Sequence, residues 1–432
     1  MKNDFPTAAL AQVWWDEAWK RDDADPLAEF ADEFYRVPGR IYLDGNSLGL
    51  LSRGAEAAVR EVMEDWRDHA VEGWTEEGNW FTMAEQLAEQ VAPLVGTTGR
   101  SVAVTGSTTV NLHQLLATLF EPKAGRTKIL IDALCFPSDR YAIESHLRLR
   151  GLDPAEHIIV ITSRDGRTLD ENRIIARLSA DIAVAILPSV VYTSGQLLDM
   201  ARITGKARQR GVLIGWDCSH SIGVVPHELD EWEADCAFWC HYKYLNGGPG
   251  AVGGLYLNER HHDRAPGLAG WWGSDKQAQF DMSDTFTPAH GAARLQVGTP
   301  SILALAPLLG SLFMYEDAGI EDVRTKSLAL TDFLRRIVES ELAPWGFTIA
   351  TPQADARRGG HLALVHPEAA RLAKALRRAN VVPDFRRPDI LRLAPAPLYT
   401  SFADVCEAVA RLKHILQFEE YLNEKDEREL VP

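Results

Sequence analysis

The sequence predicts an α/β protein, with a large domain around a mostly parallel seven-stranded sheet and a smaller α+β domain at the C-terminal end. Between residues 101 and 257, seven short β-rich runs alternate with helical ones, which is the pattern of a doubly wound sheet. Further along, a long helical stretch leads into shorter strand signals. A chain of 432 residues is long enough to divide into two domains.

The N-terminal part is predicted to be mostly helical. Short helical pieces surround a turn from Ile41 to Gly49, and residues 53–69 and 81–95 have the periodicity of helices. We expect residues 1–60 to form a segment that packs on both domains.

The large domain is expected to cover residues 61–310 and to hold all seven strands. These are residues 101–105, 128–131, 157–162, 182–187, 212–216, 236–240 and 252–257. In doubly wound sheets, ligands bind beyond the carboxyl ends of the strands.

The small domain is expected to cover residues 311–432. A helical stretch runs from Leu303 through 327–341, and strand signals follow at 347–350, 361–365 and 390–393. A helix over 401–416 precedes a charged tail, 419–429, which we expect to be solvated.

Composition and charge narrow the class of protein. The net charge is 45 − 61 = −16, which argues against nucleic acid and anionic membranes as partners. The N-terminus lacks the basic and apolar pattern of a signal peptide, and no apolar run approaches the roughly 18 residues that span a bilayer.

The five cysteines are odd in number and include no CxxC pair, which indicates reduced thiols in a cytoplasmic protein. Cys236 and Cys240 have the spacing of a ligand pair on a helix. They fall in an apolar strand, however, where a core role is favoured, and we therefore expect no metal site.

The strongest chemical signal is a carboxylate and an amine that follow two apolar strands. Asp217 comes directly after the run 211–216, and Lys243 comes shortly after the run 234–240. Pyridoxal phosphate (PLP) needs such a pair: the amine forms a Schiff base with its aldehyde, and the carboxylate keeps its pyridine nitrogen protonated. Taken singly, Asp217 would be a turn former or helix cap, and Lys243 a surface residue.

The residues around this pair add to the signal. Tyr242 and Tyr244 flank Lys243, and the glycine-rich loop 246–250 indicates backbone that takes positive φ or approaches another group closely. His220 is either a satisfied core histidine or a donor to a phosphate or carboxylate.

Two segments after predicted strands are candidates for holding the cofactor. Thr108 and Thr109 open a helix, whose N-terminus suits a phosphate, although an ordinary helix cap explains them equally well. The second segment consists of Phe136, Pro137, Ser138 and Asp139; its Phe could stack on a flat ring, or the segment could be a simple turn.

Two further candidates lie outside these strands. Trp271 belongs to a pair of tryptophans between glycines, which suits an interface anchor or a ligand wall. Arg392 stands among apolar residues and needs a carboxylate partner, which an amino-acid substrate or a structural salt bridge would supply.

Several motifs, in this order and spacing, resemble the kynureninase family of PLP enzymes, which has the aspartate-aminotransferase-like fold (fold type I). The resemblance covers nearly the whole chain. The motifs are Tyr42 to Gly49, Thr109 to His113, Phe136 to Asp139, Trp216 to His220, Tyr242 to Asn246, Gly270 to Gly273 and Arg392 to Tyr399.

The resemblance implies a role for each candidate. Lys243 would be the Schiff-base lysine, and Asp217 would pair with the pyridine nitrogen. The other implied cofactor contacts are Thr108, Thr109, Phe136, Pro137, Ser138, Asp139, His220 and Tyr242. Trp271 and Thr299 would reach the site of a neighbouring subunit in a homodimer, and Ser47 and Arg392 would bind the substrate, Arg392 through its α-carboxylate.

The implied reaction is hydrolysis of the Cβ–Cγ bond of L-kynurenine to anthranilate and L-alanine in tryptophan catabolism, with Tyr242 as the candidate proton donor. 3-Hydroxykynurenine is a second candidate substrate, because Thr299 precedes Pro300 where some members have Asn. Pro188, followed by Ser189, stands where the family usually has a hydroxyl residue. The alternatives are a fold-type-I aminotransferase, a cysteine-desulfurase-like enzyme, or a PLP-binding protein without catalysis.

Overall fold

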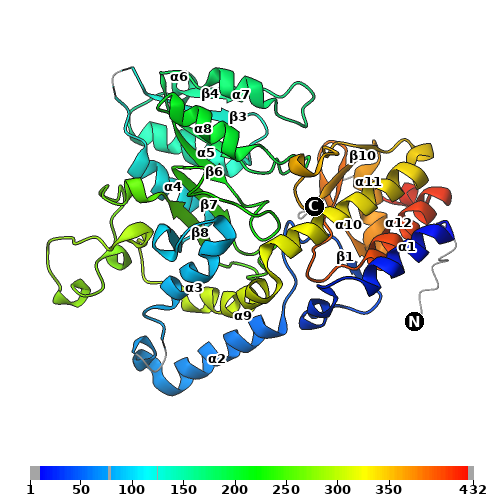
Figure 1. The fold of residues 1–432 in the computed structure, drawn as a ribbon, viewed down its shortest axis with the longest axis horizontal. Coiled ribbons are helices and arrows are strands. Elements are labelled where there is room, and N and C mark those ends of the chain that lie inside the picture. Colours follow the sequence, from blue (N-terminus) through cyan, green and yellow to red (C-terminus); the bar gives the residue numbers. More distant parts are fainter. Residues whose placement is uncertain (1–9, 76–78, 124, 427–432) are drawn as a thin grey trace.

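A seven-stranded sheet forms the centre of the larger part of the computed structural model, which describes residues 10–75, 79–123 and 125–426 (Figure 1). Its strands are β2 (Val102–Val104), β3 (Lys128–Asp132), β4 (Ile158–Ile161), β5 (Ile182–Pro188), β6 (Leu213–Asp217), β7 (Cys236–Cys240) and β8 (Gly253–Leu257). The order is β2-β8-β7-β6-β5-β3-β4. Only β8 runs opposite to the other strands, so the predicted mostly parallel sheet is confirmed.

The central strands are apolar throughout because helices cover both faces of the sheet. Every residue of β5 is buried, and from Val184 to Leu187 successive residues enter different cores. Val184 and Ile186 pack with α4 (Thr108–Leu119) and α5 (Pro137–Leu149). Ala185 and Leu187 pack with α3 (Met83–Val91) and α8 (Met200–Gln209). This alternation follows from the two-residue period of a strand.

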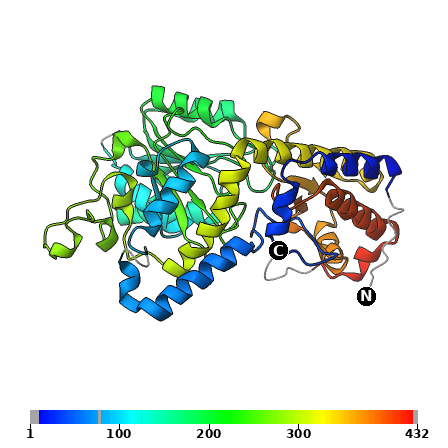
Figure 2. The same ribbon diagram turned by 60° about the horizontal axis from the view of Figure 1, so that its bottom comes forward.

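Two long helices lie side by side along one end of the large part (Figures 1 and 2). They are α2 (Arg53–His69) and α9 (Ile302–Ala318). Their backbones approach closely at two glycines, since a Cβ on Gly54 would lie 2.8 Å from the Gly310 carbonyl oxygen. Gly319, with φ at 71°, ends α9, and α10 (Ile320–Glu341) departs at 84°.

The smaller part contains a four-stranded antiparallel sheet covered by helices. Its strand order is β12 (Asp384–Arg386), β13 (Ile390–Leu393), β10 (Leu362–Val365) and β9 (Thr348–Ile349). A second apolar core joins it to α1 (Gln12–Asp23), α10, α11 (Ala369–Arg378) and α12 (Phe402–Gln417). The strands predicted at 347–350, 361–365 and 390–393 and the helix predicted at 401–416 are confirmed, whereas β12 and α11 were not predicted. Residues 427–429 of the predicted tail lie outside the described residues.

The N-terminal segment connects the two parts. Its strand β1 (Ile41–Tyr42) pairs in parallel with β11 (Val381–Val382), which belongs to the smaller part. A few residues later, the Gly49 N–H donates to the Tyr242 carbonyl, 2.8 Å away in the larger part. The turn after β1 is therefore fixed directly against the loop that carries Lys243.

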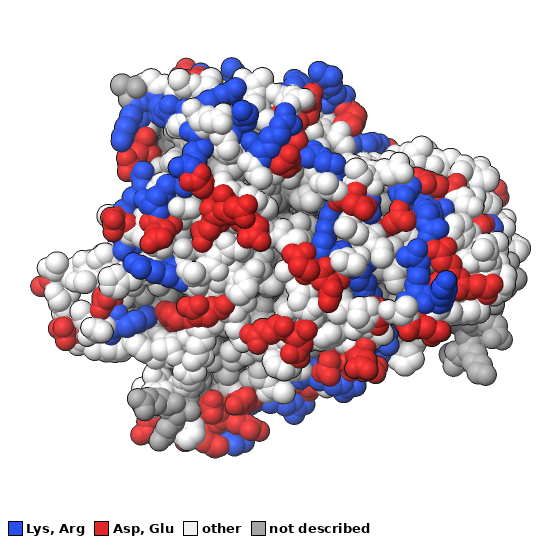
Figure 3. Space-filling model, in the orientation of Figure 1, with Lys and Arg blue, Asp and Glu red and all other residues white. Residues whose placement is uncertain are grey.

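Within the described ranges, no single helix is long and apolar enough to cross a membrane; α9 and α10 reach that length and composition only as a bent pair. The described residues also include no group of three or more His, Cys, Asp or Glu side chains placed to hold a metal ion. Acidic and basic side chains intermix over the face shown in Figure 3.

Gly310→Ala should destabilise the protein, because the new Cβ would lie 2.5 Å from the Ala55 backbone nitrogen and push α2 away from α9. We expect a loss of about 1–3 kcal/mol in the free energy of unfolding, as for other overpacked sites. Urea unfolding measures it. Gly205→Ala in α8 is the matched control, since nothing lies within 4 Å of its Cβ and alanine favours a helix. Equal stability of the two variants would contradict the close contact.

Candidate active site

A cavity of about 390 Å³ lies where the parallel strands β3, β5, β6 and β7 end. Each strand contributes through its last residue or through the loop that follows it. The lining residues are Asn46, Ser47, Ser107, Thr108, Thr109, Phe136, Ser138, Asp139, Tyr192, Asp217, Ser219, His220, Tyr242, Lys243 and Arg386. Most of the residues singled out from the sequence therefore meet in one cavity.

Asp217 and Lys243 come from adjacent strands. Asp217 is the last residue of β6, and its Oδ1 accepts a hydrogen bond from the Ser219 N–H at 2.9 Å. Lys243 follows β7, and its Nζ lies 2.9 Å from His220 Nε2. Burial, with the charge of Lys243 in second place, lowers the pKa of His220 well below its usual value. His220 is therefore a neutral imidazole beside the amine.

Three buried carboxyl groups gather at the same edge of the sheet. Burial raises the pKa of Asp139 well above its usual value; Asp217 and Asp132 raise it further, and Lys243 opposes them. Burial also raises the pKa of Asp132, the last residue of β3, to about 7. The environment thus disfavours charge on two of these carboxyl groups, which is typical of a functional site.

The N-terminus of α4 faces the cavity through Ser107, Thr108 and Thr109. Ser107 makes no side-chain capping hydrogen bond within the part of the chain that the structure describes. A Cβ on Gly253, on the neighbouring strand β8, would lie 3.0 Å from the Thr108 nitrogen. The first turn of α4 thus keeps backbone donors for an anion, and glycine allows the close approach. The helix begins at Thr108, so Thr108 and Thr109 open it as predicted.

An aromatic wall lines one side. The rings of Phe136 and Tyr192 meet edge to face at 5.4 Å, and Tyr192 lies 6.2 Å from His220. Pro137 begins α5 and does not belong to the lining. Tyr192 was not singled out from the sequence, because one tyrosine in a loop gives no signal of its own.

Two arginines on the four-stranded sheet lie beside Tyr192, with their guanidinium carbons 5.9 and 6.0 Å from its ring centroid. Arg392 is fully buried and bonds to Asp384, to the Tyr192 carbonyl at 2.6 Å and to Ser47 Oγ at 3.4 Å. Arg386, which the sequence did not indicate, pairs with the same Asp384 at 3.0 Å and lines the cavity. Arg386 is therefore the more accessible of the two guanidinium groups.

The turn after β1 supplies a third side of the cavity. Ser47 lines it, as does Asn46, whose fully buried amide finds no hydrogen-bond partner among the described residues. A buried amide without a partner beside a cavity indicates a place for a polar ligand.

Pro188 and Ser189 stand at the end of β5, where the resemblance implied a hydroxyl contact. Pro188 ends β5 and pairs with Asp217 across the sheet. The Ser189 hydroxyl is fully buried and donates to the Asp217 carbonyl at 2.8 Å. This hydroxyl braces the backbone of Asp217 and does not line the cavity.

Trp271 and Thr299 lie outside the cavity of this chain, and both are exposed. Trp271 contacts Phe280 at 5.7 Å in a loop that also exposes Met282 and Phe286.

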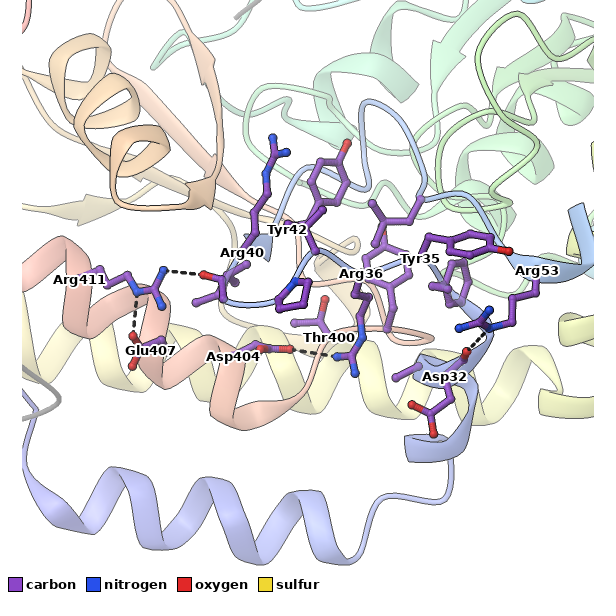
Figure 4. A pocket seen from close by; sticks show the side chains of 18 residues that line it. Asp32, Tyr35, Arg36, Arg40, Tyr42, Arg53, Thr400, Asp404, Glu407 and Arg411 are labelled. Carbon is purple, nitrogen blue, oxygen red and sulfur yellow. Dashed lines mark hydrogen bonds and ion pairs between the residues drawn. The ribbon is translucent and has the colours of Figure 1, made fainter. Parts of the chain in front are cut away.

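A larger cavity, of about 630 Å³, lies between the N-terminal segment and α12 (Figure 4). Three of the four arginines that line it are engaged by the protein. Arg36 lies 4.0 Å from Asp404, Arg411 donates to Glu407 at 2.7 Å, and Arg53 donates to a backbone carbonyl. Because these groups satisfy one another, we place the chemistry in the smaller cavity at the strand ends.

The cysteines lack the setting of a reactive thiol. Cys218, Cys236, Cys240 and Cys406 are buried. Burial raises the pKa of the half-buried Cys135 to about 12, so its thiolate is scarce at neutral pH.

Two solved structures share the fold. A mutant of the enzyme C-DES with glycine covalently linked to its PLP cofactor has a TM-score of 0.78 at 18% identity, covering 88% of this chain and 98% of that chain. The cysteine desulfurase CsdA of Escherichia coli has a TM-score of 0.73 at 18% identity, covering 91% and 98%. The likeness places the chain in the fold class of these enzymes and confirms the predicted α/β fold.

The sequence comparisons are more specific. A family model described as kynureninase C-terminal domain matches residues 323–412. The kynureninase of Geobacillus thermodenitrificans is 52% identical over 415 residues, 96% of this chain and 97% of that protein. The kynureninase of Bacillus cereus strain ZK / E33L is 51% identical over 421 residues, 97% and 98%. The chain belongs to the kynureninase family, as its motifs indicated.

Asp132→Asn should stabilise the protein more at alkaline than at acidic pH. A carboxyl group whose pKa rises from 3.8 to about 7 on folding binds a proton, so stability falls as pH rises between these values. Asn removes that loss. At ~1.36 kcal/mol per pKa unit, the gain in unfolding free energy at about pH 8 should exceed the gain at about pH 5 by roughly 2–3 kcal/mol.

Urea unfolding of the cofactor-free protein at the two pH values measures this difference. The exposed Asp23→Asn, which also removes one carboxyl group, is the control. A gain for Asp132→Asn that is equal at both pH values would disprove the assigned titration.

Proposed function

We propose that this protein hydrolyses the Cβ–Cγ bond of L-kynurenine to anthranilate and L-alanine, using PLP. The observation that carries the proposal is the group of Asp217, Lys243 and His220 at the strand ends of a chain that belongs to the kynureninase family. 3-Hydroxykynurenine stays a second candidate substrate. Thr299, the residue tied to the choice between the two compounds, lies outside the cavity of this chain.

The residues of the cavity fit PLP. The first turn of α4, with Thr108 and Thr109, suits the phosphate, and Asp217 at the base of the cavity suits the pyridine nitrogen. Lys243 is the amine that would hold the aldehyde carbon, with Phe136 and His220 beside it. When bound, the cofactor acts as an electron sink for a carbanion next to its linkage.

The remaining steps need groups that hold and move protons. The free amine of Lys243 would remove the α-proton, and His220, 2.9 Å away, would accept a hydrogen bond from the resulting ammonium group. Burial raises the pKa of Tyr242 above its usual value, so the phenol keeps its proton and can donate it to the β-carbon. Asp139, whose pKa is also raised, lines the same cavity.

The substrate side of the cavity is basic and polar. We assign the α-carboxylate to Arg392 and Ser47, with Arg386 as an additional contact because it is the guanidinium that lines the cavity. The unpartnered amide of Asn46 is a further candidate for the substrate. A cysteine desulfurase is disfavoured because, among the described residues, no exposed cysteine is present.

The purified protein should absorb visible light from bound PLP and release fluorescent anthranilate when kynurenine is added. Lys243→Ala should abolish release. Tyr242→Phe should retain the cofactor absorbance while turnover falls about 10²–10⁴-fold, as expected for loss of a well-placed general acid.

Different outcomes separate the alternatives. Turnover only with a keto-acid acceptor would indicate an aminotransferase, and absorbance without turnover a non-catalytic binding protein. If no absorbance develops with added PLP, the proposal is wrong, and unchanged turnover in Tyr242→Phe removes Tyr242 from the mechanism.

We also propose a homodimer with shared sites. Support comes from the exposed apolar loop around Trp271, Phe280, Met282 and Phe286, because such side chains suit an interface. Trp271 and Thr299 would then act at the partner's cavity.

Mixing two inactive variants tests this arrangement. Trp271→Ala and Lys243→Ala, unfolded and refolded together, should regain up to about a quarter of wild-type activity through hybrid dimers with one intact site. Each variant refolded alone is the control. A monomeric mass in light scattering, or no recovery on mixing, would contradict shared sites.

We propose a cytoplasmic location, supported by five free cysteines. Recovery of the protein in a secreted fraction would contradict it.

A further inference from the structure

His361, directly before β10, is a buried titratable group that the proposed mechanism does not use. Its side chain is fully buried, and neither ring nitrogen has a hydrogen-bond partner among the residues the structure describes. A buried imidazole without partners is costly, so its position calls for a physical reason.

The surroundings of His361 hold it closely. Gly195 has φ at +73°, and a Cβ there would lie 3.2 Å from His361 Nε2 and 3.3 Å from its Cδ2. A Cβ on Gly360 would lie 2.8 Å from the Tyr244 hydroxyl. Two glycines therefore make room for the ring and for the backbone that carries it.

The neighbour of functional interest is His220. The two imidazole rings contact each other at a centroid distance of 6.1 Å and an interplanar angle of 63°. This separation leaves room for a direct hydrogen bond after a small turn of one ring, or for one bridging water. His220 Nε2 is taken by Lys243 at 2.9 Å, whereas its buried Nδ1 has no partner within residues 10–75, 79–123 and 125–426.

Both rings are neutral at physiological pH. Burial lowers the pKa of each well below its usual value, and the facing positive charges of Lys243, Arg386 and Arg392 lower it further. The Tyr192 carbonyl partly offsets this for His361, although its geometry does not amount to a hydrogen bond. A neutral imidazole has one nitrogen that donates through its N–H and one that accepts through its lone pair. Each ring can therefore exist as either of two tautomers.

The contact with Lys243 decides the tautomer of His220. An ammonium group only donates, so His220 must offer its lone pair at Nε2 and carry its proton at Nδ1. That N–H is buried and needs an acceptor.

We propose that His361 is a positioning residue, which accepts a hydrogen bond from His220 Nδ1 and thereby fixes the tautomer that presents a lone pair to Lys243. Through this contact, His361 stabilises the protonated form of the nitrogen of Lys243. Because the effect acts at the lysine, it does not depend on which amino acid the site takes.

The visible absorbance of PLP bound to Lys243 changes with protonation of the linking nitrogen, so a pH titration of the holoenzyme reads the effect. His361→Leu has no acceptor for His220 Nδ1, so His220 turns its N–H toward the nitrogen of Lys243. The pH midpoint of the absorbance titration should then fall by about one unit. In His361→Gln, whose amide oxygen can accept, the midpoint should stay near the wild-type value.

His146→Leu is the matched control. His146 is also buried and also has an Nε2 without a partner in the described part of the chain. It lies on α5, however, and its ring contacts Phe120 at the end of α4, not His220. The pH midpoint of the absorbance titration should be the same in His146→Leu as in the wild type. A midpoint unchanged in His361→Leu, or shifted equally in the Leu and Gln variants, would overturn the proposal.

A second measurement needs no variant. NMR of labelled histidines in the cofactor-free, full-length protein distinguishes the two tautomers; His220 protonated at Nδ1 supports the proposal, and at Nε2 overturns it. Neither measurement uses kynurenine. If the protein fails to hydrolyse kynurenine while the midpoint shifts, the proposed function fails and this inference stands.

Discussion

The parallel pairing of β5, β6 and β7 is the constraint on which the site depends. Because these strands run in the same direction, the groups that follow them meet at one edge of the sheet. Asp217 has a strand on each side, facing Pro188 and Phe238, and its carbonyl also accepts the Ser189 hydroxyl. The carboxylate of Asp217 is thus carried by backbone held on both sides, which is the kind of support that a functional group needs.

Charge is distributed unevenly around the cavity. The large sheet and α5 bring the carboxyl groups of Asp132, Asp139 and Asp217, two of which have a raised pKa, whereas the four-stranded sheet brings the guanidinium groups of Arg386 and Arg392. The positive charge therefore lies on the arginine side. This favours an orientation in which the carboxylate of an amino-acid substrate points toward Arg386 and Arg392. The same burial that makes charges interact strongly also explains the neutral histidines beside Lys243.

Much of the fold could be predicted because the signal is repeated. The strands of the large sheet are buried on both faces, so they appear in the sequence as continuous apolar runs such as 182–187. Strand β12 escaped prediction because it is three residues long and contains Asp384 and Arg386. Nothing in a single short, charged segment distinguishes it from a loop.

The site was predictable where function leaves a local pattern. Asp217 and Lys243 each follow an apolar run, so their chemistry can be inferred from the strand ends. Tyr192 and His361 gave no such signal, because they matter only through contacts with residues distant in the sequence. Those contacts are set by tertiary packing, which no local pattern encodes.

The pairing of β1 with β11 has a consequence for synthesis on the ribosome. Residues 41–42 leave the ribosome long before residues 381–382, the strand with which they pair. The turn with Asn46 and Ser47 can take its place beside Arg392 only after β11 and β13 have emerged from the exit tunnel. Until then, Lys243 of a nascent chain lies beside a cavity wall that is still incomplete.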